Sequence, residues 1–126
     1  MDTQGERYAI VIGIEDYEDK SIDPVRFAEQ DAKDFYRMIT EAKEGGYERK
    51  NVELILSREA THGRIAKAIR EMFEKVYETD SLLLYYTGHG EYTSFGGYLI
   101  PSDFRKGEEI TAKGYSLTDN VQDIVH

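Results

Sequence analysis

Three apolar runs alternate along the chain with two longer stretches in which apolar positions recur every three or four residues. The runs span residues 8–14, 52–56 and 82–85. The first and third are continuously apolar, which is typical of strands covered on both faces in a parallel sheet. The second, Val-Glu-Leu-Ile-Leu, predicts a shorter strand.

Each of the two longer stretches predicts an amphipathic helix. The first starts at Asp23-Pro24 and ends at Gly45-Gly46, and the second follows the N-cap Thr61 and ends at residues 79–80. The apolar stripes are Val25, Ala28, Ala32, Phe35, Ile39 and Ala42 in the first, and Ile65, Ala68, Ile69, Met72, Phe73 and Val76 in the second. One face of each helix is therefore expected to pack on the sheet.

The order strand, helix, strand, helix, strand predicts a βαβαβ unit with right-handed crossovers. The fold class is α/β, a three-layer sandwich with a mainly parallel sheet. A polar, glycine-dotted stretch follows Pro101, and a short amphipathic pattern then opens at Ser116, with apolar residues at Leu117, Val121, Ile124 and Val125. With no repeats or linkers, residues 1–126 are expected to form a single domain.

The third strand leads into Thr-Gly-His-Gly, with Gly88 and Gly90 on either side of His89. Parallel sheets carry their chemistry at the carboxyl ends of the strands, and the glycines leave room for another backbone to approach. We therefore expect His89 to lie in a crevice. The alternative is a simple turn, since glycines around a histidine are common there.

Composition narrows the function classes. The net charge of -9 and a pI near 4.8 argue against a nucleic-acid or anionic-membrane surface. No apolar run approaches the roughly 20 residues that span a bilayer, and the amino terminus lacks the regions of a signal peptide, so a cytoplasmic location is expected. The absence of cysteine fits a reducing compartment and leaves this chain without a thiol nucleophile.

The histidine segment and its flanks resemble those of the caspase and metacaspase superfamily, peptidase C14. The shared pattern is an apolar strand, Thr-Gly-His-Gly, and a downstream Tyr-Leu-Ile-Pro-Ser-Asp at residues 98–103; the opening Tyr-Ala-Ile-Val-Ile-Gly-Ile-Glu-Asp-Tyr at residues 8–17 extends the likeness over essentially the whole chain. In that family a nucleophilic cysteine follows on the strand beside the histidine strand. The resemblance implies a p20-type amino-terminal half, truncated before the nucleophile strand.

The resemblance also implies site residues. His89 matches the catalytic histidine, which assists the thiolate and protonates the leaving amine. Gly90 matches the residue whose backbone N–H helps form the oxyanion hole. Thr87 matches a Ser/Thr near the substrate pocket of metacaspases, although a strand-end hydroxyl also commonly bonds nearby backbone.

Residues 26–32, Arg-Phe-Ala-Glu-Gln-Asp-Ala, resemble the metacaspase segment Arg-Gly-Cys-x-Asn-Asp-Ala, with Phe27 and Ala28 in place of its glycine and cysteine. Asp31 then corresponds to the aspartate that lines a pocket for Arg or Lys before the cleaved bond. Arg26 is a second candidate for substrate binding, because caspases use an arginine to bind aspartate, but its spacing fits less well. The alternative for Asp31 is an exposed helix carboxylate, alone or paired with Arg26 or Lys33.

No cofactor or metal is predicted. His62 and His126 have no partners at metal-ligand spacing. Some metacaspases are activated by calcium, but the acidic loop at residues 15–19, including Asp16, lacks the spaced ligands and glycine of an EF-hand. Asp16 is a weaker candidate for the substrate pocket and more simply a turn residue.

Three functions compete. The first is part of a cysteine endopeptidase that binds a protein or peptide substrate and cleaves after Arg or Lys; the chain itself should be inactive alone. The second is a non-catalytic scaffold of the same fold, and the third is a flavodoxin-like receiver or nucleotide-binding module, disfavoured because no glycine-rich phosphate loop follows the first strand. The expected partner is the missing carboxyl-terminal half, or a second copy bound at an open sheet edge.

Overall fold

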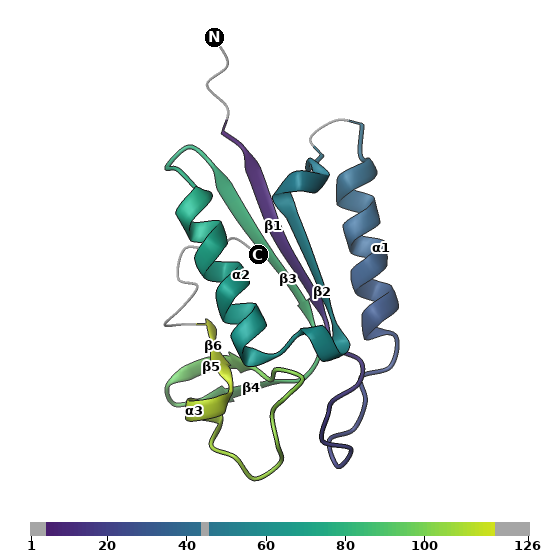
Figure 1. Cartoon of the computed structure of the whole chain (residues 1–126), viewed down its shortest axis with the longest axis vertical. Helices are drawn as coiled ribbons and strands as arrows, with labels where there is room; N and C mark the ends of the chain where they lie inside the picture. Colours follow the sequence, from purple (N-terminus) through teal and green to yellow (C-terminus); the bar gives the residue numbers. More distant parts are fainter. Residues whose placement is uncertain (1–4, 44–45, 118–126) are drawn as a thin grey trace.

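The computed structural model describes residues 5–43 and 46–117, and its centre is a three-stranded parallel sheet (Figure 1). The strands are β1 (Arg7–Gly13), β2 (Val52–Leu56) and β3 (Ser81–Thr87), in the order β2-β1-β3. Ile12 pairs with Ile55 on one side and with Tyr86 on the other. The three predicted strands and their parallel pairing are confirmed.

One helix covers each face of this sheet, as Figure 1 shows for α1 (Ala28–Glu41) and α2 (His62–Lys75). Alternate residues of β1 feed the two cores, because successive side chains of a strand point to opposite faces. The α1 core contains Ala9, Val11, Ala32 and Ile39, and the α2 core contains Ile10, Ile12, Ile65, Ile69, Leu82 and Leu84, among others. The α/β three-layer prediction is confirmed.

The helix boundaries differ from those predicted. The first helix begins at Ala28 and not at Asp23-Pro24, because the Val25 N–H donates to the Glu15 carbonyl at 2.8 Å and Phe27 is left-handed, with φ 69°. It ends at Glu41, where Ala42 turns to an extended conformation, and Gly45 lies outside the described residues.

The second helix begins as the sequence indicates. The Thr61 hydroxyl accepts the Arg64 N–H at 3.2 Å, which confirms the predicted N-cap. The helix ends at Lys75, earlier than predicted, because Val76 is already extended, with φ -82° and ψ 124°.

A second, antiparallel sheet lies at the carboxyl ends of the parallel strands (Figure 1). It consists of β4 (Gly90–Thr93), β5 (Gly96–Leu99) and β6 (Tyr115–Ser116) in that order, with the short helix α3 (Ile110–Lys113) beside it. The short 3-10 helices η1 (Arg49–Asn51) and η2 (Ser57–Glu59) flank β2.

The amphipathic pattern predicted from Ser116 onward is largely untested. Ser116 belongs to β6, Leu117 directly after it is helical, and residues 118–126 lie outside the described part of the chain. Among the helices that are described, none combines the length and the apolar content needed to cross a bilayer.

Candidate active site

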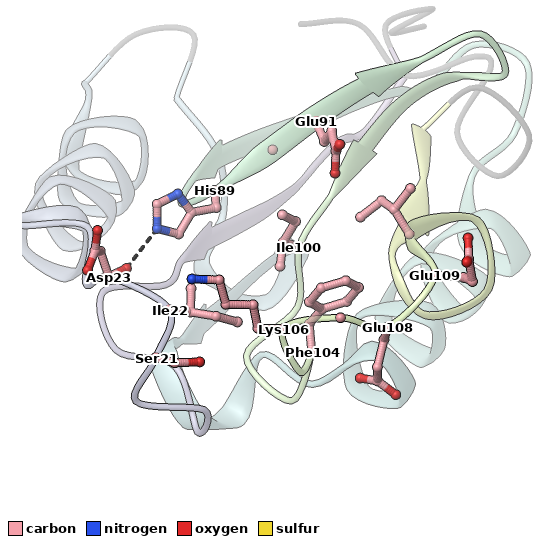
Figure 2. Close-up of a pocket in the computed structure, with 13 residues that line it drawn as sticks. Ser21, Ile22, Asp23, His89, Glu91, Ile100, Phe104, Lys106, Glu108 and Glu109 are labelled. Atoms are coloured by element: carbon pink, nitrogen blue, oxygen red, sulfur yellow. Dashed lines mark hydrogen bonds between the residues drawn. The ribbon is translucent and has the colours of Figure 1, made fainter.

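The strand β3 delivers His89 to a cavity of about 540 Å³ at the carboxyl edge of the sheet (Figure 2). The side chain is half-buried and borders this cavity. The other lining residues are Ser21, Ile22, Asp23, Gly90, Glu91, Ile100, Phe104, Lys106, Gly107, Glu108, Glu109 and Ile110. The predicted position of the histidine in a crevice is confirmed.

The His89 imidazole is tied to the loop after β1. Its Nε2 lies 2.7 Å from the Asp23 carbonyl oxygen, the contact drawn in Figure 2. A carbonyl oxygen can only accept, so Nε2 carries the hydrogen in this contact. In the neutral ring Nδ1 is then the unprotonated nitrogen, and it is the one able to accept a proton from a nucleophile.

The peptide group of His89 is held by two tyrosines that the sequence did not single out. The His89 N–H donates to the Tyr17 oxygen at 3.0 Å, and the Tyr86 hydroxyl donates to the His89 carbonyl. The Tyr17 hydroxyl in turn donates to the Ile100 carbonyl at 3.0 Å, and its ring lies 5.3 Å from the imidazole, centroid to centroid. Both ends of the histidine backbone are therefore fixed by side chains.

Burial keeps these two tyrosines neutral. It raises the pKa of Tyr17, against the opposing effect of its hydrogen bond with Tyr86, and it raises the pKa of Tyr86 with a further contribution from Tyr17. A tyrosine inside a buried strand needs a partner for its hydroxyl. That requirement is the one signal in the sequence that could have pointed to Tyr86.

The Gly90 N–H, at the start of β4, is directed away from the neighbouring strand β5. The Ile100 N–H donates to the His89 carbonyl at 3.0 Å, and bonded and non-bonded pairs alternate along an antiparallel ladder. The next pair, Gly90 with Leu99, is consequently non-bonded across the ladder. The Gly90 N–H therefore faces away from β5 in the residue next to His89, and its role in an oxyanion hole stays a prediction.

Thr87 ends β3, where its carbonyl accepts the Ile14 N–H at 2.8 Å. It is half-buried and does not line the His89 cavity. Asp31 is exposed on the first turn of α1, on the β3 side of the sheet, where its charge adds to burial in raising the pKa of Tyr85. None of the ion pairs found in residues 5–43 and 46–117 involves Asp31.

Arg26 lines a separate cavity of about 580 Å³, together with Asp16, Phe27 and Lys33 among others. Its guanidinium carbon lies 5.8 Å from the centroid of the Phe27 ring. The structure thus brings His89 and Gly90 together at one cavity, while Arg26 lies at another and Asp31 and Thr87 line neither. The substrate-binding roles of Asp31, Thr87 and Arg26 stay predictions.

No group of three or more His, Asp or Glu residues in the described ranges is arranged to hold a metal ion. The His62 ring contacts the Tyr115 ring edge-on at 5.6 Å between centroids. His126 lies outside the described residues.

A comparison with protein-family models agrees with the histidine segment and the α/β architecture. The model of the caspase domain of peptidase C14 matches residues 6–124. The chain belongs to the caspase domain family. A search of curated proteins finds no match to this caspase domain. The resemblance seen in the sequence is confirmed at the level of the family, which supports a caspase-like peptidase.

Proposed function

We propose that this caspase domain is the histidine-bearing part of a cysteine endopeptidase that cleaves after Arg or Lys, with the nucleophilic thiol supplied from outside these 126 residues. The observation that carries the proposal is the hydrogen bond from His89 Nε2 to the Asp23 carbonyl, which leaves Nδ1 as the acceptor nitrogen of a side chain that lines the cavity. The chain contains no cysteine, so the thiol is not its own.

The chemistry follows from that arrangement. The thiol gives its proton to His89 Nδ1, and the thiolate attacks the amide carbonyl of the substrate. The outward N–H of Gly90 stabilises the resulting oxyanion, a contribution of about 3 kcal/mol for a typical donor. The imidazolium then gives the proton to the leaving amine as the C–N bond breaks, and water hydrolyses the thioester with His89 as the base.

The preference for Arg or Lys rests on Asp31. Its carboxylate is exposed and has no ion-pair partner in the described part of the chain, so it is available to a substrate cation. A carboxylate can bind a guanidinium through two parallel charge-assisted hydrogen bonds. Thr87 and Arg26 are secondary contributors to substrate binding in this proposal. No cofactor is required, calcium activation stays open, and the cytoplasm is the proposed location.

The test compares the 126-residue chain with the same chain supplied with a cysteine-bearing strand, taken from what its gene encodes beyond residue 126. Peptides with Arg, Lys or Asp before a fluorogenic group report cleavage. We expect no turnover by the chain alone and turnover of Arg and Lys peptides by the completed protein. His89→Ala should abolish cleavage of every peptide, and turnover that survives it would refute the proposal.

Asp31→Asn separates specificity from catalysis in the completed protein. In the proposal the bound substrate buries the pair with Asp31, and losing one partner of such a pair costs about 2–5 kcal/mol, so kcat/KM for an Arg peptide should fall at least about tenfold. An unchanged kcat/KM, or cleavage after Asp, would leave Asp31 as an exposed helix carboxylate only.

The second candidate is a non-catalytic scaffold of the same fold, favoured by the absence of cysteine. A gene that encodes no cysteine-bearing strand beyond residue 126 would decide for the scaffold.

A further inference from the structure

The cavity beside His89 has an apolar floor and a charged rim. Ile22, Ile100, Phe104 and Ile110 supply the floor, of which Phe104 is buried and the isoleucines are half-buried. Figure 2 shows Ile22, Ile100 and Phe104 arranged around one space with His89 at its edge. A long, partly aliphatic side chain fits such a lining better than a short polar one.

The carboxylate of Asp19 links the two segments that form the walls of the cavity, residues 19–23 and 104–110. Asp19 accepts the Lys106 N–H at 2.8 Å and the Ser21 N–H at 2.9 Å. Residues 19–23 and 104–110, which are far apart in the sequence, are thereby held at a set separation. The cavity is a built feature of the fold and not a gap between independent loops.

The charge at the rim is predominantly negative. Asp23, Glu91, Glu108 and Glu109 contribute carboxylates, and Lys106 contributes the one ammonium group among the lining residues. Glu108 already accepts the Arg105 N–H at 2.7 Å. Glu91 and Glu109 are exposed and take part in none of the ion pairs found among the described residues, so both are available to a ligand cation.

The cavity also lies beside the side chain that protonates the leaving amine in the proposed reaction. In that reaction His89 Nδ1 gives its proton to the leaving amine, and the same imidazole lines the cavity. The chain that begins at that amine therefore starts beside this space. Resting on the proposed peptidase function, we infer that the cavity binds the residues on the leaving-group side of the cleaved bond and selects Lys or Arg there.

The recognition follows from the two parts of the lining. The methylene stem of a lysine or arginine lies over the isoleucines and Phe104, and the cationic end reaches Glu91 and Glu109. An acidic side chain would meet four carboxylates against one ammonium. Lys106 is the one ammonium group of the lining and repels a ligand cation, so its removal should favour a basic ligand.

The test needs no thiol, because the leaving fragment can be supplied directly to the 126-residue chain. The probes are the dipeptide amides Lys-Gly, norleucine-Gly and Glu-Gly, which share a free α-amine and differ in side-chain charge. Titrations followed by amide NMR report the affinity and the place of binding. We expect shifts at Ile22, Gly90 and Ile110, and binding of Lys-Gly about threefold or more tighter than of norleucine-Gly, as for two partly exposed ion pairs.

Variants with opposite effects make the result decisive. The double variant Glu91→Gln/Glu109→Gln should remove the advantage of the lysine peptide, and Lys106→Gln should increase it. Glu74→Gln is the matched control, because it changes the net charge but lies at a different cavity beside α2.

Equal affinity for the lysine and norleucine peptides, tighter binding of Glu-Gly, or shifts confined to other surfaces would each overturn the inference. These outcomes are independent of the peptidase proposal, which is tested by the turnover of the completed protein and by its loss in His89→Ala. A lysine advantage that persists in the double variant would place the binding elsewhere and overturn it as well.

Discussion

At the scale of single residues, the Tyr17 hydroxyl makes hydrogen bonds with two backbone groups. Its oxygen accepts the His89 N–H and its hydroxyl donates to the Ile100 carbonyl, both at 3.0 Å, and the residue is 2% exposed. An unpaired polar group in such a site costs about 1–3 kcal/mol. Tyr17 is therefore a positioning residue for the histidine as well as part of the core.

Tyr17→Phe keeps the ring and removes the oxygen. We expect the free energy of unfolding, measured in urea, to fall by about 1–3 kcal/mol. We also expect the nitrogen NMR signals of the His89 ring to show a mixture of tautomers in place of the Nε2–H form alone. Tyr92→Phe is the control, because Tyr92 is 90% exposed. Unchanged ring signals in Tyr17→Phe would show that the Asp23 carbonyl holds the imidazole without help.

Phe27 carries backbone strain that a glycine would relieve. It has φ 69° and is 66% exposed, so it bears the cost of a left-handed conformation with little burial in return. That conformation costs a residue with a Cβ about 1–2 kcal/mol. The metacaspase-like segment has glycine at this position, and the left-handed turn is kept here with a phenylalanine.

Phe27→Gly should therefore raise the free energy of unfolding by about 1 kcal/mol, the left-handed penalty less the greater freedom of glycine in the unfolded chain. Met38→Gly is the matched control, an equally exposed apolar residue inside α1, where glycine should lower stability by about 1 kcal/mol. Thermal unfolding measures both. A loss of stability in Phe27→Gly would mean that its ring is needed where it lies.

At the scale of elements, Asp19 joins the loop after β1 to the loop before α3. The Ser21 hydroxyl, the Lys106 N–H and the Ser21 N–H all donate to its carboxylate, and they lower the pKa of Asp19 from 3.8 to about 2. A carboxylate whose pKa is lower in the folded protein than in the unfolded chain stabilises the fold at pH values above its unfolded pKa. This contribution is lost as the pH falls through its folded pKa.

Asp19→Asn should consequently lower stability at neutral pH and lose that effect in acid. The difference in melting temperature between the parent and the variant should be constant above about pH 4 and shrink from there to about pH 2. Asp103→Asn provides a comparison, since Asp103 lies in the same loop before α3 but accepts the His62 N–H of α2, at 3.0 Å. A difference that does not change with pH would mean that the carboxylate charge is not what holds the two loops.

The sequence predicted elements well where a local pattern decides them. Residues 52–56 form β2 as predicted, and Thr61 caps α2, because apolar runs and caps are local signals. The start of α1 was missed because it depends on Glu15, whose carbonyl takes the Val25 N–H. The strand β4 was missed because its residues are mostly exposed and carry no alternation of polar and apolar side chains.

The same distinction applies to the site. The crevice position of His89 follows from the order of strand and glycines, a local pattern. The contacts of His89 with Asp23 and Tyr17 join residues 66 and 72 positions apart, and only the folded chain brings them together. Asp31 illustrates the limit of local motifs. The segment at residues 26–32 suggested a substrate-binding role for it, but a motif does not give its position relative to His89, and its exposed carboxylate lies outside the His89 cavity.

At the scale of the whole molecule, the parallel sheet has β3 at one border. Among the described residues β3 pairs with β1 alone. The Ser81 N–H donates to the Glu6 carbonyl and the Thr87 carbonyl accepts the Ile14 N–H, so the odd-numbered residues of β3 face β1. Because backbone groups alternate in direction along a strand, the N–H and C=O groups of Leu82, Leu84 and Tyr86 face the opposite border.

This border is the place where we expect another strand to bind, either from the cysteine-bearing segment or from a second copy of the chain, since an unpaired strand edge is a template for pairing. In dilute solution the amides of Leu82 and Leu84 should exchange with deuterium faster than those of Leu83 and Tyr85 in the same strand. As the protein concentration rises, self-association through this edge should slow exchange at Leu82 and Leu84 and leave Leu83 and Tyr85 unchanged, while sedimentation reports a growing dimer. Equal protection of all four amides at every concentration, with a monomer throughout, would show that the border of β3 is already covered within the chain and would remove it as the site for a partner.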